Sequence, residues 1–176
     1  MALNPQSPLQ RLMERFPHAG RVEWIGLSPQ AREPLVEVAW ARAVAGRGLE
    51  GDRRVHGRAS SKRQVTLIQA EHLEVVSRML ASEDVRPGLL RRNIVVSGIN
   101  LLALKDQMFR LGDIVLEGTG LCTPCSRMEA NLGAGGYNVM RGHGGITARV
   151  ITGGMLHIGA PVRAGDGSGA DPSSTI

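Results

Sequence analysis

The chain has 176 residues, a formal net charge of +5 and 21% charged residues, which suits a single folded domain. It contains no run of about 18 apolar residues that could span a membrane, and its N-terminal MALNPQSPLQRLMERF lacks the basic-then-apolar order of a secretory signal. Its two cysteines are too few for a disulfide scaffold, so we expect free thiols and a reducing, cytoplasmic location.

The basic residues are divided unevenly, as 19 Arg and 2 Lys. Arg presents a planar fork that suits phosphate and carboxylate, whereas Lys is a mobile point charge. Two interpretations stay open: a GC-rich genome that favours Arg codons, and a subset of arginines that lines an anionic ligand site. Neither Lys62 nor Lys105 has a Schiff-base context, so we expect no pyridoxal phosphate.

A short helix is the first predicted element; Ser7 is its N-cap and Pro17 ends it. Its apolar residues recur at i, i+3, i+4 and i+7, and they are Leu9, Leu12, Met13 and Phe16. We expect this helix to pack on the rest of the fold or on a neighbouring subunit. The second arrangement leaves a homodimer open as an assembly.

Short strands fill most of the remaining chain. Apolar residues that alternate or run together predict strands over residues 21–27, 35–44, 64–68, 93–97, 108–118 (in two pieces), 148–152 and 155–163. Helical spacing predicts one strong helix over residues 69–80. Residues 46–61 have no apolar period and predict a loop, whose unusual length itself points to a function.

This order of elements predicts a mainly β fold, a closed β-barrel with one or two peripheral helices. No βαβ alternation is visible, which argues against a doubly wound sheet. We expect three parts: a helical extension over residues 1–20, a barrel domain over 21–164 and a disordered tail over 165–176. The tail consists largely of Gly, Ser, Asp and Pro.

The segment 121–127, LCTPCSR, is the sharpest candidate for chemistry. Thiolates are soft metal ligands and nucleophiles that nearby cations stabilise, and Arg127 lies two residues beyond Cys125. Pro124 fixes the backbone before Cys125, which suits the presentation of one sulfur. Three alternatives stay open. A structural zinc lacks a second ligand pair, a thioredoxin-like redox pair lacks its βαβ context, and either cysteine could be inert and buried.

Three further loops carry cationic or polar side chains that suit an anionic ligand. The loops are GLEGDRRVHG at 48–57, RRNIVVSG at 91–98 and NVMRGHGG at 138–145. Their candidate residues are Arg53 and His56, then Arg92 and Asn93, and lastly Arg141 and His143. Glycines around the last pair expose backbone N–H groups and can form an anion-binding nest. A solvated loop and an exposed strand start are the alternatives for the first two.

Taken in order, these segments resemble the MOSC domain family, named for the C-terminal domain of molybdenum-cofactor sulfurases. The resemblance covers residues 22–163 and includes Leu111-Gly112-Asp113 between the second loop and the cysteines. The chain departs from the family in two places. Many members have His directly after Gly-Asp-Arg, whereas here two residues precede His56; some have a second Cys where this chain has Met128.

The resemblance implies a barrel that handles the molybdenum cofactor and has one essential cysteine, which corresponds to Cys125. That residue would ligate the metal or carry sulfur. The resemblance and the charges also suggest that Arg53, Arg92 and Arg141 hold the cofactor's anionic phosphate. The remaining cofactor-binding candidates are His56, Asn93, Arg127 and His143.

Three hypotheses about function follow. The first is a molybdenum-dependent reductase component for N-hydroxylated compounds, supplied with electrons by an external donor. The second is a sulfur carrier, in which Cys125 receives persulfide sulfur from a cysteine desulfurase and passes it to a metal centre. The third is a nucleic-acid-binding module. It is the weakest, because two Trp, one Tyr and two Phe offer few platforms for stacking bases.

Overall fold

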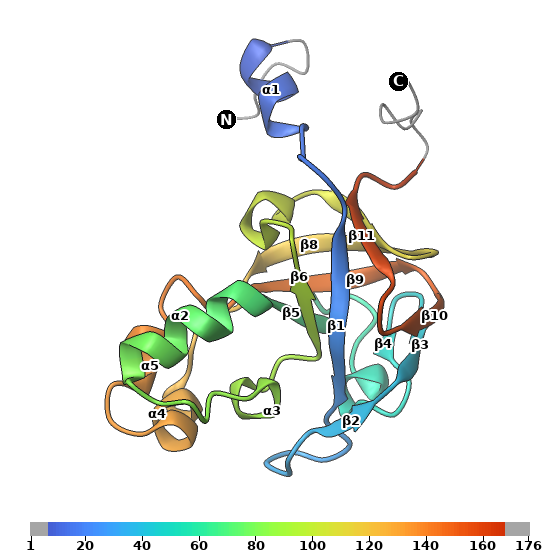
Figure 1. Cartoon of the computed structure of the whole chain (residues 1–176). Helices are drawn as coiled ribbons and strands as arrows, with labels where there is room; N and C mark the ends of the chain where they lie inside the picture. The colour runs from blue at the N-terminus through green and yellow to red at the C-terminus, as the bar shows by residue number, and fades with distance from the viewer. Residues whose placement is uncertain (1–6, 168–176) are drawn as a thin grey trace.

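The computed structural model describes residues 7–167, and a β-barrel forms its centre (Figure 1). Its strands are β1 (Gly20–Leu27), β5 (Val65–Gln69), β6 (Ile94–Ser97), β7 (Met108–Leu111), β8 (Ile114–Leu121), β9 (Ile146–Thr152) and β11 (Pro161–Ala164). These seven strands follow one another in the order β11-β7-β8-β9-β5-β6-β1. The barrel closes because β11 pairs antiparallel with β1, with Gly20 opposite Val162. The predicted closed, mainly β barrel is confirmed.

A smaller, three-stranded sheet contacts the barrel, and part of one predicted strand belongs to it. The predicted strand over 35–44 is two strands, β2 (Val36–Val38) on the edge of β1 and β3 (Trp40–Val44) in the smaller sheet. There β3 lies between β10 (Gly154–His157) and β4 (Gly48–Leu49). The carbonyl of Ala39 accepts a hydrogen bond from the Ile158 N–H at 3.1 Å, which fixes the chain where it passes between the sheets.

One crossover in the barrel is of the βαβ kind, which the sequence pattern did not reveal. Strands β5 and β6 are parallel, and the connection between them contains α2 (Ala70–Leu80) and α3 (Pro87–Leu90). All five residues of β5 are buried, because one face meets the barrel interior and the other meets the helices. Burial along β5 (Val-Thr-Leu-Ile-Gln) is therefore continuous, and its sequence lacks the alternation of a half-buried strand.

The helices gather on one side of the barrel, where Figure 1 shows α2, α3, α4 and α5 together. Here α4 is Ser126–Leu132 and α5 is Gly136–Val139. A second apolar core joins them to β5 and β6, through Ile68, Val76, Leu90, Val95, Met128 and Met140. The helices are thus more numerous than the one or two expected. The main core fills the barrel itself.

The N-terminal helix α1 (Pro8–Met13) projects away from the barrel in Figure 1. Its predicted cap is confirmed, since the Ser7 hydroxyl accepts a hydrogen bond from the Gln10 N–H at 3.1 Å. None of its residues is buried, and Leu9, Leu12 and Met13 are each more than half exposed. The apolar side chains of α1 are therefore not buried by the rest of residues 7–167.

The predicted loop over residues 46–61 contains β4 and a short 3-10 helix, η1 (Arg53–His56). The Asp52 side chain caps η1 by accepting a hydrogen bond from the Arg54 N–H. Residues 168–176 of the predicted tail lie outside the described residues. No helix within residues 7–167 is both long enough and apolar enough to cross a membrane.

Candidate functional site

Arginines from four segments of the chain line one cavity of about 290 Å³, which we call the arginine cavity. Its cationic residues are Arg53, Arg54, Arg63, Arg91, Arg92 and Arg127. Ser28, Leu35, Cys125 and Met128 complete the lining, and no acidic side chain belongs to it. A concave surface of one charge sign attracts ligands of the opposite sign, so this cavity suits an anion.

The two cysteines have different surroundings. Cys125 is exposed, lines the arginine cavity and immediately precedes α4. Its carbonyl accepts a hydrogen bond from the Met128 N–H at 2.8 Å, and the buried Met128 side chain anchors α4 in the second core. Cys122 is 1% exposed, and its Sγ lies 3.3 Å from the Arg63 Nη2 that donates to it. One thiol is therefore presented to the cavity, and the other is buried outside its lining, in contact with Arg63.

A buried carboxylate holds the loop that carries the first two arginines. Asp52 is 1% exposed, and its Oδ2 accepts hydrogen bonds from the Ser28 N–H at 2.9 Å and from Asn93 Nδ2 at 2.8 Å. Its Oδ1 accepts from the Arg54 N–H at 2.9 Å. Asn93 is itself fixed, because its Oδ1 accepts from the Thr66 N–H at 3.1 Å. Asn93 therefore positions the loop that carries Arg53 and Arg54, and it does not line the cavity.

Arg92 is only 3% exposed and is held by three backbone carbonyls. Its Nε donates to Gly144 O at 2.8 Å, its Nη1 to Leu90 O at 2.7 Å and its Nη2 to Cys122 O at 3.1 Å. Burial lowers the pKa of Arg92, and the nearby Cys122 opposes that shift. Arg92 contributes charge to the cavity, but its main contacts hold three chain segments together.

Two of the arginines keep their hydrogen-bonding capacity for a ligand. Within residues 7–167, the guanidinium groups of Arg53 and Arg127 make no hydrogen bond and no ion pair. Arg91 is partly engaged, donating to Glu33 O at 2.7 Å and to Ser28 Oγ at 3.3 Å. Because a guanidinium carries five donors in a fixed fork, such groups bind oxyanions in two-pronged fashion.

The pKa values of the arginines indicate crowding of positive charge. Burial lowers the pKa of Arg91, and the positive charges of Arg127 and Arg53 lower it further. Burial also lowers the pKa of Arg54, against the attraction of Asp52. Arginine stays protonated despite such shifts, so the repulsion persists in the folded protein. A bound anion relieves this repulsion and gains several charge-assisted hydrogen bonds.

Four of the predicted site residues meet in this cavity: Cys125, Arg53, Arg92 and Arg127. Arg141 lines a different cavity, and His56 is exposed on η1 and belongs to the lining of neither. The His143 ring packs edge-on against His72, with ring centroids 5.2 Å apart, and its Nδ1 lies 2.9 Å from Val139 O. The structure therefore brings four of the eight predicted site residues into one cavity and places the other four outside its lining.

Three arginines of the cavity were not among the predicted residues. Arg54 and Arg91 adjoin predicted residues, so the doubled arginines in RRV and RRN were a usable indication. Arg63 carried no such indication. It directly precedes Gln64 and β5, and only the fold brings it to Cys122.

Comparison with known families decides the relationship of the chain. The family model described as the MOSC domain matches residues 52–166, which is most of the chain. The match includes Arg53, Arg54, Cys125 and the last barrel strand. The chain belongs to the MOSC domain family. This family is associated with binding of the molybdenum cofactor.

Solved structures agree with that assignment at the level of the fold. The YuaD protein from Bacillus subtilis superposes on this MOSC protein with a TM-score of 0.71 at 17% identity, covering 82% of this chain and 94% of the other. YiiM from Escherichia coli gives 0.62 at 18% identity, with coverage of 82% and 69%. YiiM from Geobacillus stearothermophilus gives 0.65 at 14% identity, with coverage of 83% and 75%. No curated protein sequence matches.

Proposed function

We propose that this MOSC protein binds the molybdenum cofactor at the arginine cavity, with the Cys125 thiolate as a ligand of the metal. One observation carries the proposal: an exposed thiol shares a cavity with six arginines and no acidic side chain. Thiolate sulfur is a soft ligand of the kind that thiophilic metals prefer. The cofactor's phosphate needs cationic side chains whose N–H groups are not already used in other hydrogen bonds.

The residues present fit such a group. Arg53 and Arg127 would hold the phosphate, because their guanidinium groups have no other hydrogen-bond partner within residues 7–167. Arg91 would assist with the donors that Glu33 O and Ser28 Oγ leave free. Cys125 would supply the sulfur ligand from its place just before α4. When bound, the cofactor supplies two-electron redox chemistry.

We further propose that the protein is the reductase component for N-hydroxylated compounds and takes its electrons from an external donor. The exposure of Cys125 and the openness of the cavity favour access of a small substrate and a partner to the same place. The task of this chain is then to hold an anionic cofactor, to fix one thiolate and to leave the cavity mouth accessible.

Elemental analysis tests the proposal. Wild-type protein purified from a cofactor-competent host is expected to contain molybdenum near stoichiometry, and Cys125→Ser is expected to lose it. Cys122→Ser is the matched control and is expected to retain the metal, because Cys122 is buried and does not line the arginine cavity. Wild-type protein without molybdenum would contradict the proposal. With a chemical electron donor, the loaded protein is expected to convert benzamidoxime to benzamidine.

A sulfur carrier is the second candidate, and the exposure of Cys125 favours it as well. Here the Cys125 thiolate attacks the outer sulfur of a desulfurase cysteine persulfide, so that Cys125 becomes a persulfide and the desulfurase cysteine leaves as a thiolate. Mass spectrometry after incubation with a cysteine desulfurase and cysteine is expected to find one added sulfur on Cys125. An unmodified Cys125 thiol would count against this role.

A further inference from the structure

Residues 122–124 line a second cavity of about 250 Å³, which we call the glycine-loop cavity. It shares no lining residue with the arginine cavity. Its walls come from the end of β8, the segment 122–124, α5 and the glycine-rich turn that follows α5. The two cavities therefore offer separate sites, one lined by Cys125 and the other by the segment directly before it.

The lining of this cavity combines apolar groups with one cation. Leu102, Leu121 and Tyr137 are 40%, 53% and 43% exposed, which is unusual for large apolar side chains gathered in one place. Arg141 is the single charged residue of the lining, and no acidic side chain accompanies it. Within residues 7–167, Arg141 makes no side-chain hydrogen bond or ion pair. An apolar pocket with one convergent polar group is typical of small-molecule sites.

Close backbone packing makes the cavity wall rigid. A Cβ at Gly144 would lie 2.1 Å from Cys122 O, and one at Gly145 would lie 1.8 Å from Leu67 O. Only glycine allows the turn to approach these two carbonyls. Glu129 holds the start of α5, since its carboxylate accepts hydrogen bonds from the Tyr137 N–H at 2.8 Å and the Gly135 N–H at 2.9 Å. The cavity is thus formed before any ligand binds.

We propose that the glycine-loop cavity binds a small, flat organic acid, with the carboxylate on Arg141 and the ring against Tyr137 and the leucines. The volume is just below the range of about 300–1,000 Å³ for drug-sized ligands, which indicates a molecule of one or two rings. The single unpaired cation specifies a single anionic group. The sharply charged arginine cavity, by contrast, would reject the apolar part of such a ligand.

The inference stands apart from the molybdenum proposal, because it concerns a different set of residues. It adds a functional consequence, since a ligand held here touches Thr123 and Pro124, directly before Cys125. A second organic ligand would thereby lie beside the segment that positions the thiol.

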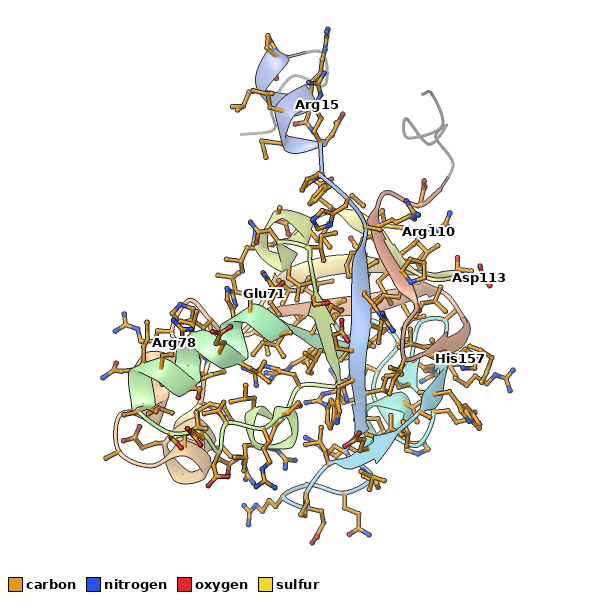
Figure 2. The ribbon with its side chains drawn as sticks, in the orientation of Figure 1. Arg15, Glu71, Arg78, Arg110, Asp113 and His157 are labelled. Carbon is orange, nitrogen blue, oxygen red and sulfur yellow. The ribbon has the colours of Figure 1, made fainter. Side chains whose placement is uncertain are left out.

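Titration of the full chain with 2-naphthoate, followed by calorimetry and by ligand-observed NMR, tests the inference. Naphthoate is expected to bind, and Arg141→Gln is expected to weaken binding about fivefold or more, as loss of a partly exposed charge-assisted contact does. The neutral analogue 2-naphthalenemethanol is expected to bind the wild type more weakly than naphthoate does, by a similar factor. Its affinity is expected to be the same for the wild type and for Arg141→Gln. Arg78→Gln is the control, because Arg78 lies on α2 (Figure 2) and its side chain is 78% exposed.

Competition separates this site from the arginine cavity. Inorganic phosphate and the variant Arg127→Gln are expected to leave naphthoate affinity unchanged. Loss of naphthoate binding in Arg127→Gln, or equal affinity in the wild type and Arg141→Gln, would overturn the inference; so would the absence of naphthoate binding at millimolar concentration. A dimer that excludes naphthoate and that Leu121→Asp dissociates would assign the surface to a second copy instead. Circular dichroism checks that each variant is folded.

Discussion

The two cavities beside residues 122–124 are similar in size, about 290 and 250 Å³, but they are held open by opposite means. The arginine cavity brings like charges together, so its residues need buried polar partners such as Asp52 and the carbonyls around Arg92. The glycine-loop cavity has one charge and needs only close backbone contact. A cationic site therefore depends on a hydrogen-bond network, whereas an apolar site depends on shape.

Arg92→Ala is the change expected to have the largest effect, because it separates structural from ligand-binding arginines. It removes three hydrogen bonds and leaves the carbonyls of Gly144, Leu90 and Cys122 without their partner. We expect a loss of about 3 kcal/mol in the free energy of unfolding, measured by urea denaturation. Arg127→Ala is the matched control, and its unfolding free energy should change by no more than about 0.5 kcal/mol. Equal losses of unfolding free energy in Arg92→Ala and Arg127→Ala would contradict the distinction between a structural and a ligand-binding arginine.

Gly144→Ala tests the other cavity and is expected to have a smaller effect. Its Cβ would lie 2.1 Å from Cys122 O, and a backbone carbonyl cannot move aside as a flexible side chain can. We expect a loss of about 2 kcal/mol in unfolding free energy, together with weaker naphthoate binding. For comparison, Gly88→Ala meets no atom within 4 Å and should be nearly neutral. A neutral Gly144→Ala would show that the glycine turn is not closely packed in solution.

Glu129→Gln is expected to have the smallest effect, and that effect depends on pH. The backbone N–H groups of Tyr137 and Gly135 hold the pKa of Glu129 below its ordinary value of 4.5. A carboxyl whose folded-state pKa is depressed stabilises the fold above its unfolded pKa, and this contribution disappears as the pH falls through the folded-state pKa. The Tm difference between wild type and Glu129→Gln should therefore be constant above pH 4.5 and shrink below it. A difference that grows on acidification would refute this role.

The sequence was sufficient for the barrel and for the thiol. Short apolar strands with regular spacing indicated the architecture, and LCTPCSR marked Cys125, which lines the arginine cavity. The helices α3, α4 and α5 have four to seven residues, too few for a helical period to be recognised. The fully buried β5 hid the parallel crossover, because strands covered on both faces lose their alternation.

The side of the chain to which each loop residue points could not be predicted. Arg141 and His143 belong to a glycine-rich segment that does suit an anion, but Arg141 lines the glycine-loop cavity and the His143 ring packs against His72. Asn93 looked like a ligand-binding residue and instead supports Asp52. Arg63 reaches Cys122 across 59 positions of sequence, a distance over which no local pattern carries information.

Closure of the barrel has a consequence for how the protein is made. The final seam joins Gly20 and Arg21 of β1 to Val162 and Pro161 of β11, so the first and last strands must meet. Contacts between residues so far apart in sequence form slowly, because the intervening chain must first be ordered. During synthesis, β1 leaves the ribosome well before β11, because all the other barrel strands lie between them in the sequence. Until β11 has emerged, the edge of β1 that pairs with it is exposed to other chains, and the barrel cannot close.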